Sequence, residues 1–374
     1  MKSLKNNKIL FLYSNTPNPI IEERLFLFKK KFKFEVDIIY INRVNSNLSF
    51  QEYLKNLNDI NIHKIYALDS RGINFNKIKL IFRLISKIKK INKNFDYIYS
   101  VYPDMFLSSF IYKYVFNYKV KLIHEFQDIV SMPFIFEFTY YKMLNTSYKN
   151  FFTSPGFIDY IKENFNKEIN RNSIYLPSLP FSKKLKKKSP NQSKNKKYIT
   201  YGFFGILRYS FQVEIINFFL KLNSSNRIIV AGNGDYQQKV INKFKNNHRV
   251  KIFKTFSAED LKSNILPKVD IVPCIYPDTV NYHYHIARRF FDALSNGIPV
   301  LVLNRSKYML EYIDKYHVGY NFKDLQDLKK NQEKICSKFD FYKKNATKHK
   351  QIFDFENFLN KNYNIIFDFK WKYP

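Results

Sequence analysis

The sequence predicts an α/β protein built from two Rossmann-like domains, each a doubly wound parallel sheet. Short apolar runs of strand length alternate with segments of helical periodicity, and hairpin-turn signals are almost absent between them. The alternation stops once, at 181–197, in a stretch of Lys, Ser and Asn typical of an exposed basic linker, and then begins again. A length of 374 residues is also sufficient for about two domains.

The first half of the chain opens with a strand, a helix and a second strand. The run KILFLY at 8–13 has the continuous apolar character of a strand that is buried on both faces. Residues 20–31 carry apolar side chains at helical spacing, and FEVDIIYI at 34–41 is the next strand. Further strands are expected at 96–101, 120–124, 151–154 and 173–176, with a helix at 105–116. This pattern predicts a first domain at 1–180.

The second half repeats the alternation over 198–350. Strands are expected at 198–204 (YITYGFF), 227–231, 250–253, 270–274 and 299–303. The helices between them are expected at 213–222, 236–246, 258–266 and 285–295. A last helix-like segment, 353–367, lies in the tail 351–374, which is expected to pack back towards the first domain.

The composition is strongly basic, with 63 Lys and Arg against 31 Asp and Glu and a formal net charge of +32. The abundant Lys, Asn, Ile, Phe and Tyr all have A/T-rich codons, so base composition explains part of the excess. The remainder would favour anionic partners, including an anionic membrane surface. A docking face on the first domain would then combine Lys29, Lys30, Lys31, Lys33 and the segment 83–90 with the apolar Ile81, Leu84, Ile85 and Ile88.

Several protein classes are excluded by the same inventory. Two cysteines, Cys274 and Cys336, cannot build a disulfide scaffold, and they suit a reducing cytoplasm. No apolar run reaches the length of a membrane helix, and the first residues lack a signal-peptide core. Nucleic-acid-binding signatures are absent, so nucleic acid is not an expected partner. We expect a cytoplasmic protein, peripheral on the inner membrane if the charge is functional.

Glycines and cations follow the strands of the second half. Gly205-Ile206-Leu207-Arg208 comes after 198–204, and Gly232-Asn233-Gly234-Asp235 comes after 227–231. Residues 271–302 contain Arg289, Asp292 and the string Gly297-Ile298-Pro299-Val300. Together these motifs resemble the donor site of the retaining, glycogen-synthase-like bacterial glycosyltransferases of the GT-B fold (family 4 type). Arg289 stands where that family has Lys, and Asp292 stands where it has Glu.

This resemblance implies an enzyme that moves a hexosyl unit, with retention, from a nucleotide-sugar donor to a glycan or lipid-linked acceptor. The implied setting is the biosynthesis of bacterial surface polysaccharide, such as capsule or lipopolysaccharide. The second domain would bind the donor and the first the acceptor, with a cleft between them. No cofactor and no metal are expected, because Arg side chains and backbone dipoles stabilise the leaving diphosphate in place of an ion.

The resemblance and the chemistry of a sugar diphosphate assign roles to individual residues. Arg offers a planar fork to phosphate oxygens, Gly permits close backbone approach, and a carboxylate can accept both ribose hydroxyls. The diphosphate is assigned to Gly205, Arg208 and Arg289, the ribose to Asp292, the nucleotide loop to Gly232, Gly234 and Phe256, and the donor-sugar surroundings to Asn281 and Tyr284. The catalytic candidates are Asp128, Glu125 and His124, and the acceptor candidates are Asn18, Arg24 and Asp104. Arg288 is expected to point away from the site.

Two positions depart from the family pattern, and two other functions stay open. Tyr284 stands eight positions before Asp292, where the family has an acid, and Gln212 and Val213 stand where a Lys is common. Both departures leave the stereochemical outcome open. A nucleotide-sugar epimerase on the same fold is the main alternative, and a basic nucleic-acid-binding protein is the other. His283 and His285, with Asp278 near, suggest a possible metal site, but the sequence supplies no clear third ligand, and His residues lining the donor cleft are the expected interpretation.

Overall fold

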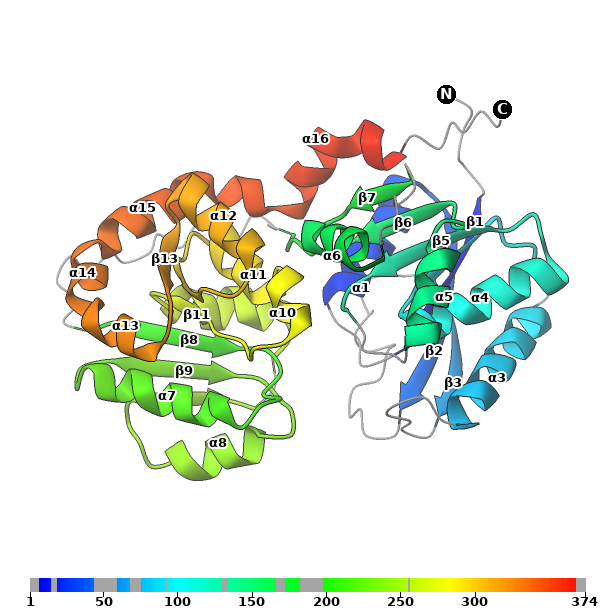
Figure 1. The fold of residues 1–374 in the computed structure, drawn as a ribbon. Coiled ribbons are helices and arrows are strands. Elements are labelled where there is room, and N and C mark those ends of the chain that lie inside the picture. The colour runs from blue at the N-terminus through cyan, green and yellow to red at the C-terminus, as the bar shows by residue number, and fades with distance from the viewer. Residues whose placement is uncertain are drawn as a thin grey trace. The chain divides into compact units, whose positions relative to one another are not determined.

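The structure, a computed structural model, describes residues 7–14, 19–43, 59–67, 75–91, 93–129, 134–165, 172–181, 198–254 and 256–367. The chain divides into two compact units, which we call unit 1 (Met1–Ser178 and Asn364–Pro374) and unit 2 (Leu179–Tyr363). Both are α/β units with parallel sheets, which confirms the predicted fold class (Figure 1). The linker expected at 181–197 lies, apart from Phe181, outside the described residues and stays a prediction.

Unit 1 contains one seven-stranded sheet in the order β3-β2-β1-β4-β5-β6-β7. Its strands are β1 (Lys8–Ser14), β2 (Glu35–Arg43), β3 (Asn61–Ala67), β4 (Tyr97–Val101), β5 (Lys121–Phe126), β6 (Lys149–Phe152) and β7 (Ser173–Tyr175). All neighbouring pairs run parallel. The central strands β1, β4 and β5 are buried almost throughout, as their continuous apolar runs predict.

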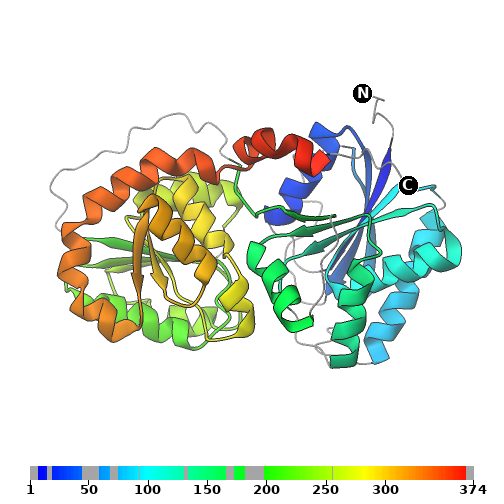
Figure 2. The same cartoon turned by 45° about the horizontal axis from the view of Figure 1, so that its top comes forward.

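Helices cover both faces of this sheet. They are α1 (Pro19–Phe26), which continues into the π-helical turn η1 (Leu27–Lys31), α3 (Phe75–Ile91), α4 (Pro103–Phe116), α5 (Phe134–Leu144) and α6 (Pro155–Phe165). Figure 2 shows α1 on one face and α3, α4 and α5 on the other. This division follows from right-handed crossovers, because the chain moves one way from β1 to β2 and the opposite way from β3 onwards.

Unit 2 has two three-stranded parallel sheets, β10-β9-β8 and β11-β12-β13. The strands are β8 (Thr200–Phe204), β9 (Arg227–Ala231), β10 (Val250–Phe253), β11 (Val272–Cys274), β12 (Val300–Leu303) and β13 (Gly319–Phe322). A parallel bridge between Tyr201 and Ile271 places β8 beside β11. The six strands therefore follow the order 3-2-1-4-5-6 of a dinucleotide-binding fold.

The helices of unit 2 lie between these strands in the sequence and follow the last of them. They are α7 (Phe211–Leu222), α8 (Gln237–Phe244), α9 (Ala258–Asp260), η2 (Leu261–Ile265), η3 (Leu266–Lys268), α10 (Val280–Tyr284), α11 (Arg288–Ser295), α12 (Lys307–Tyr316), α13 (Leu325–Lys330), α14 (Gln332–Ser337), α15 (Phe339–His349) and η4 (Lys350–Phe353). The last helix, α16 (Phe355–Phe367), begins in unit 2. Its residue Ile366, in the part assigned to unit 1, accepts a 2.9 Å hydrogen bond from Lys149 through its carbonyl oxygen.

Several elements differ from the sequence-based expectation, among them β13, α5, α6 and α12 to α15, which were not expected, and the two that follow. β3 was not expected, because its sequence NIHKIYA mixes polar and apolar side chains, as an edge strand with exposed Lys64 and Tyr66 does. The helix expected at 285–295 begins only at Arg288, and Ala287 before it has an extended backbone. This later start places Arg288 and Arg289 in the first turn of α11.

Candidate functional site

The strand order of unit 2 locates a ligand site before any side chain is considered. The chain direction across the sheet reverses between β8 and β11, and open α/β sheets bind ligands outside the carboxyl ends of strands at such a reversal. The loops that follow β8, β9 and β11 leave from these carboxyl ends. They contain Gly205 to Arg208, Gly232 to Asp235, and Tyr276.

The loops after β8 and β9 are joined by backbone contacts. Leu207 donates its N–H to the carbonyl of Asn233 at 2.7 Å, and Tyr236 donates to the carbonyl of Leu207 at 3.0 Å. Gly232 is required at this junction, since a Cβ there would lie 1.8 Å from the carbonyl oxygen of Gly205. Gly205 itself has φ of +106°, a backbone conformation that favours glycine. The two glycines thus act as a pair that brings the loops together.

Replacing Gly232 with alanine is therefore expected to displace the Gly205 loop. We expect a loss of about 1–3 kcal/mol in the free energy of unfolding, as for other overpacked sites. Nucleotide-sugar binding should weaken with it. Urea denaturation and calorimetry would measure the two effects. Asn233→Ala is the matched control, because that side chain is exposed between the two glycines; equal effects of both variants would contradict the steric argument.

Arg289 is the side chain that best fits the diphosphate role. Its Nη2 lies 3.2 Å from where a Cβ of Gly205 would be, so the guanidinium covers the bare backbone of that glycine. The guanidinium carbon lies 5.9 Å from the ring centre of Phe204 and 5.5 Å from that of Tyr276. Its Nε is buried and has no hydrogen-bond partner in the described structure. A buried donor of this kind favours an anionic ligand.

Tyr276 is a site residue that the sequence analysis missed. Its ring stacks on Tyr282 at 4.7 Å, and its carbonyl accepts a 2.6 Å hydrogen bond from Arg305. Burial raises the pKa of its hydroxyl, so that the group stays protonated at neutral pH. The signal was present in the sequence, because Tyr276 follows a predicted strand at its carboxyl end.

Arg208 and Gln212 belong to the same loop as Gly205. Arg208 is exposed, and the described part of the chain offers it no hydrogen bond or ion pair, so it is available to a ligand. Gln212 accepts a 2.9 Å hydrogen bond from the backbone N–H of Tyr209. Gln212 therefore helps to hold this loop in its conformation.

Asp292 lies near the start of α11 but is already engaged. Its Oδ1 accepts a 3.0 Å hydrogen bond from Nε of Arg288, one helical turn away, and its side chain is largely buried. Arg288 therefore shares a helix face with Asp292. Both the orientation of Arg288 away from the site and Asp292 as ribose ligand stay predictions. Asn281 and Tyr284 lie half-buried on α10, and Phe256 lies half-buried just before α9.

In unit 1 the structure does not support His124 as a catalytic group. His124 is fully buried on β5, stacked 4.4 Å from Phe106, with Nδ1 2.9 Å from the carbonyl oxygen of Ser100 and Nε2 bonded to the Tyr140 hydroxyl. Burial lowers its pKa to about 3. A neutral imidazole whose two nitrogens are both satisfied inside the core is a structural residue.

The depressed pKa of His124 predicts a loss of stability in acid. The unfolded chain, with a histidine pKa near 6.5, binds the proton more readily than the folded chain does. The contribution of neutral His124 to the free energy of unfolding is therefore fully present above about pH 6.5. It falls by about 1.4 kcal/mol per pH unit as the pH decreases towards 3. Urea midpoints measured from pH 7 to pH 4 should decline less steeply in His124→Phe than in the wild type. Parallel declines would assign the acid sensitivity to other groups.

Glu125 and Arg24 form a buried ion pair in unit 1. Glu125 Oε1 lies 2.8 Å from Nη2 and 2.9 Å from Nε of Arg24, and Oε2 accepts a 2.5 Å hydrogen bond from Tyr99. Arg24 also donates to the carbonyl of Leu176 at 2.9 Å. Burial, the largest single effect, would lower the pKa of Arg24, but Glu125, Tyr99 and Glu23 together outweigh it and raise the pKa. With both side chains inaccessible, the structure does not support a catalytic base at Glu125 or an acceptor ligand at Arg24.

The accessible candidates of unit 1 lie at the carboxyl ends of its strands. Asp104 is half-buried in the first turn of α4, directly after β4, and Asp128 is exposed after β5. Between β4 and α4, Tyr102 has φ of +76°, a strained conformation for a residue with a side chain. The strand order reverses between β1 and β4, so Tyr102 and Asp104 adjoin the reversal. Asn18 lies outside the described residues.

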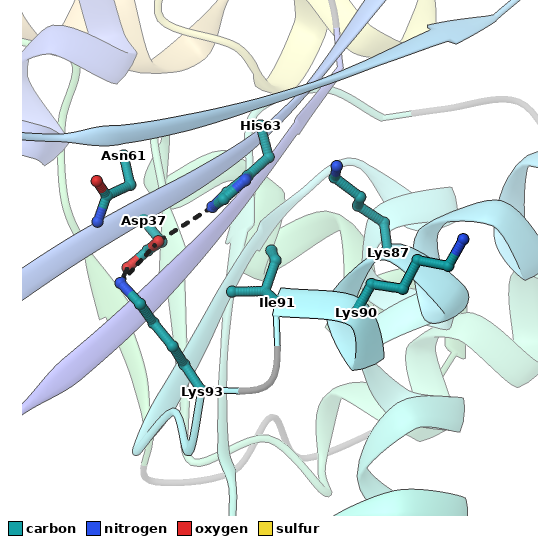
Figure 3. Close-up of a pocket in the computed structure, with 7 residues that line it drawn as sticks. All are labelled: Asp37, Asn61, His63, Lys87, Lys90, Ile91 and Lys93. Carbon is teal, nitrogen blue, oxygen red and sulfur yellow. Dashed lines mark hydrogen bonds and ion pairs between the residues drawn. The ribbon is translucent and has the colours of Figure 1, made fainter.

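A pocket of about 390 Å³ opens at the other edge of this sheet (Figure 3). Asp37 and His63 lie near the amino ends of β2 and β3, and Nε2 of His63 is 3.1 Å from Oδ1 of Asp37. Lys93 donates to both Asp37 oxygens, at 3.0 and 3.2 Å. The buried Asp37 carboxylate is already bonded to Lys93 and His63, and it lies away from the carboxyl ends of the strands. We therefore assign this cluster a structural role.

No metal site is formed by His, Cys, Asp or Glu among the described residues. Nε2 of His283 is 2.6 Å from Oδ1 of Asp278, but both side chains are exposed and they stand as a pair. No helix in the described ranges is long and apolar enough to cross a membrane.

The comparisons with known proteins agree with the fold. No protein-family model and no curated protein sequence matches the chain. Solved structures do match. A glycosyltransferase from Rickettsia africae ESF-5 has 16% identity and a TM-score of 0.68, covering 96% of this chain and 98% of its own. A lipopolysaccharide outer core galactosyltransferase has 14% identity and a TM-score of 0.61, covering 96% of this chain and 99% of its own. A UDP-GlcNAc 2-epimerase from Neisseria meningitidis bound to UDP-GlcNAc has 13% identity and a TM-score of 0.60, covering 96% of this chain and 99% of its own.

These likenesses show that the chain has the GT-B fold. At such low identities they extend to the fold alone, and both glycosyltransferases and epimerases are represented. The choice between the two activities therefore depends on the site.

Proposed function

We propose that this protein is a glycosyltransferase that moves a hexosyl unit from a nucleotide sugar to a glycan or lipid-linked acceptor. The observation that carries the proposal is Arg289, with its buried, unpartnered Nε beside Gly205 at the strand reversal of unit 2. A departing nucleoside diphosphate develops negative charge, and a preorganised guanidinium stabilises that charge. Arg208 would add a second cation from the neighbouring loop.

The remaining chemistry is assigned by position. Asp292 would accept a ribose hydroxyl through its second oxygen while Arg288 holds the first. Asn281, Tyr284, Tyr276 and Phe256 would surround the sugar and the base. In unit 1, Asp128 and Asp104 are the accessible carboxylates for orienting or deprotonating the acceptor hydroxyl. We propose retention on the sequence resemblance.

A donor screen followed by a turnover assay tests this proposal. Thermal shift with a panel of nucleotide sugars should identify one donor, because a ligand that binds the folded state raises stability by RT ln(1 + [L]/Kd). With that donor, release of free nucleotide should depend on added acceptor. The product anomer, assigned by NMR, tests retention. A panel without any stabilising nucleotide sugar would contradict the proposal.

An epimerase is the second candidate, supported by the fold shared with the UDP-GlcNAc 2-epimerase. An epimerase would convert the donor sugar with no acceptor present, whereas a transferase needs one. Conversion of a nucleotide sugar to its epimer in the absence of acceptor would therefore select this alternative.

We further propose that the reaction needs no metal ion. Arg288 adjoins Arg289 on α11 and Arg208 belongs to the loop of Gly205, and the described residues contain no group of three or more His, Cys, Asp or Glu that could hold a metal ion. Turnover should be unchanged after treatment with EDTA. Complete loss of activity that a divalent cation restores would contradict this expectation, and Asp278→Asn and His283→Gln would then be the variants to examine.

The proposed setting is the cytoplasm, in the assembly of a bacterial surface polysaccharide such as capsule or lipopolysaccharide. The fold shared with a lipopolysaccharide outer core galactosyltransferase supports it, as does the +32 charge, which favours a peripheral position on an anionic membrane face. Nucleic acid is not among the proposed partners.

A further inference from the structure

Unit 1 carries a face of exposed apolar side chains on α3, α4 and the turn after α4. Phe82 on α3, Val115 on α4 and Tyr118 in the turn are 65%, 63% and 74% exposed. Others in the same region are Ile78, Tyr114 and Phe116. We call these six residues the α3–α4 face. Figures 1 and 2 both show α3 and α4 side by side on one face of the sheet.

The same face is basic and lacks carboxylates. Neither 75–91 nor 105–121 contains Asp or Glu. The exposed cations are Lys79, Arg83, Lys89 and Lys90 on α3 and Lys119 in the turn. Lys89 lies 4.2 Å from the ring centre of Phe116, which links the ends of the two helices, and Lys119 lies 5.9 Å from that of Tyr118. Exposed rings and cations are therefore interspersed along both helices and the turn after α4.

We propose that the α3–α4 face docks on an anionic lipid bilayer. Aromatic rings favour the headgroup level of a membrane, lysines favour anionic lipid, and aliphatic tips gain by entering the acyl region. The inference rests on the proposed function in one respect: docking on the membrane would give the enzyme access to a lipid-linked acceptor.

This face differs from the one that the sequence predicts. Leu84, Ile85 and Ile88 are buried in the core, so they cannot enter a bilayer. Lys29 to Lys31 belong to η1, which continues α1 on the opposite face of the sheet from α3 (Figure 2). They cannot share one docking plane with Arg83.

Two other occupants fit the face less well. A second copy of the chain would bring two carboxylate-free basic surfaces together, which repel. A nucleic acid would use the lysines and the rings, but the aliphatic Val115 and Ile78 gain nothing from base stacking or phosphate contacts. An anionic bilayer accommodates the rings, the cations and the aliphatic groups.

Co-sedimentation of the full chain with vesicles tests the proposal. Binding is expected to phosphatidylglycerol-containing vesicles, to weaken as salt is added, and to be much lower for phosphatidylcholine alone. Arg83→Gln, Lys89→Gln and Lys119→Gln combined should lower the partition coefficient at least about tenfold. The matched control, Lys239→Gln, Lys243→Gln and Lys245→Gln on and after α8, makes the same change in net charge and should stay within about twofold of the wild type.

A second pair of variants isolates the apolar contribution. Phe82→Ser with Val115→Ser should lower binding to anionic vesicles at least about fivefold, and Phe341→Ser with Val280→Ser, the same residue types exposed on unit 2, should not. Equal losses in test and control variants, or no vesicle binding at low salt, would overturn the proposal. So would a gel shift with RNA, or a dimer in size-exclusion chromatography, that the α3–α4 variants abolish while vesicle binding persists.

Turnover with a water-soluble acceptor, measured on the same variants, separates this inference from the proposed function. It should be unchanged where vesicle binding is lost. A chain that binds vesicles as expected but shows no transfer with any donor would leave the docking face supported and the glycosyltransferase contradicted.

Discussion

Arg289→Ala is expected to lower kcat/KM by about 100-fold with the donor that the screen identifies. Loss of a single preorganised donor to developing negative charge costs about 2.7–4 kcal/mol in the transition state of other enzymes. The structure places the Arg289 guanidinium over Gly205, and its Nε has no hydrogen-bond partner in the described part of the chain. Most of the loss should appear in kcat, because the charge on the diphosphate grows as the bond breaks.

Two arginines of the same unit serve as controls for this result. Arg227→Ala should have no effect on turnover. Arg227 lies at the amino end of β9, away from the carboxyl ends of the strands, and its guanidinium stacks 3.9 Å from the ring centre of Tyr198. Arg288→Ala should cost a few-fold by freeing Asp292. Steady-state kinetics on all three would decide the matter, and a larger loss for Arg288 than for Arg289 would exchange their roles.

The fold could be predicted because its signals are local. A strand buried on both faces must be apolar at every position, and KILFLY and PVLVL satisfy this condition. The strand ends then indicate where a ligand binds, and Gly205 and Gly232 follow two of them. The donor role of Arg289 is inferred from the family resemblance and stays a prediction. β3 is half-exposed at the sheet edge, and its mixed sequence contains no comparable signal.

Partnerships between distant residues could not be predicted. Glu125 and His124 are polar residues near a strand end, which describes a catalytic group and a buried structural group equally well. The distinction depends on Arg24, 101 positions earlier in the chain, on Tyr99 and on Tyr140. The start of α11 is a smaller difference. A helix from 285 or from 288 brings Arg288 and Asp292 one turn apart equally well, and the observed start at 288 changes only that Arg288 and Arg289 lie in the first turn.

The buried pair of Arg24 and Glu125 leads to the largest expected effect on stability. Arg24→Met should destabilise unit 1 by about 3–5 kcal/mol, because it leaves the Glu125 carboxylate buried without its cation. Methionine retains much of the volume, so the loss would report charge more than packing. The double variant Arg24→Met with Glu125→Leu should recover part of the loss, since it removes the desolvation costs of Arg24 and Glu125, while the buried Glu23 carboxylate, 3.9 Å from Arg24, still loses its cation.

Hydrogen exchange of the β4 and β5 amides would measure these changes in the intact chain, since both strands lie in the core of unit 1. Protection should fall in Arg24→Met and return in part in the double variant. Glu125→Gln separates the structural role from a catalytic one. If Glu125 is a structural partner, the β4 and β5 amides should lose protection in Glu125→Gln, and kcat should fall only as far as the folded fraction falls. If protection were intact and kcat fell by orders of magnitude, Glu125 would instead have a catalytic role.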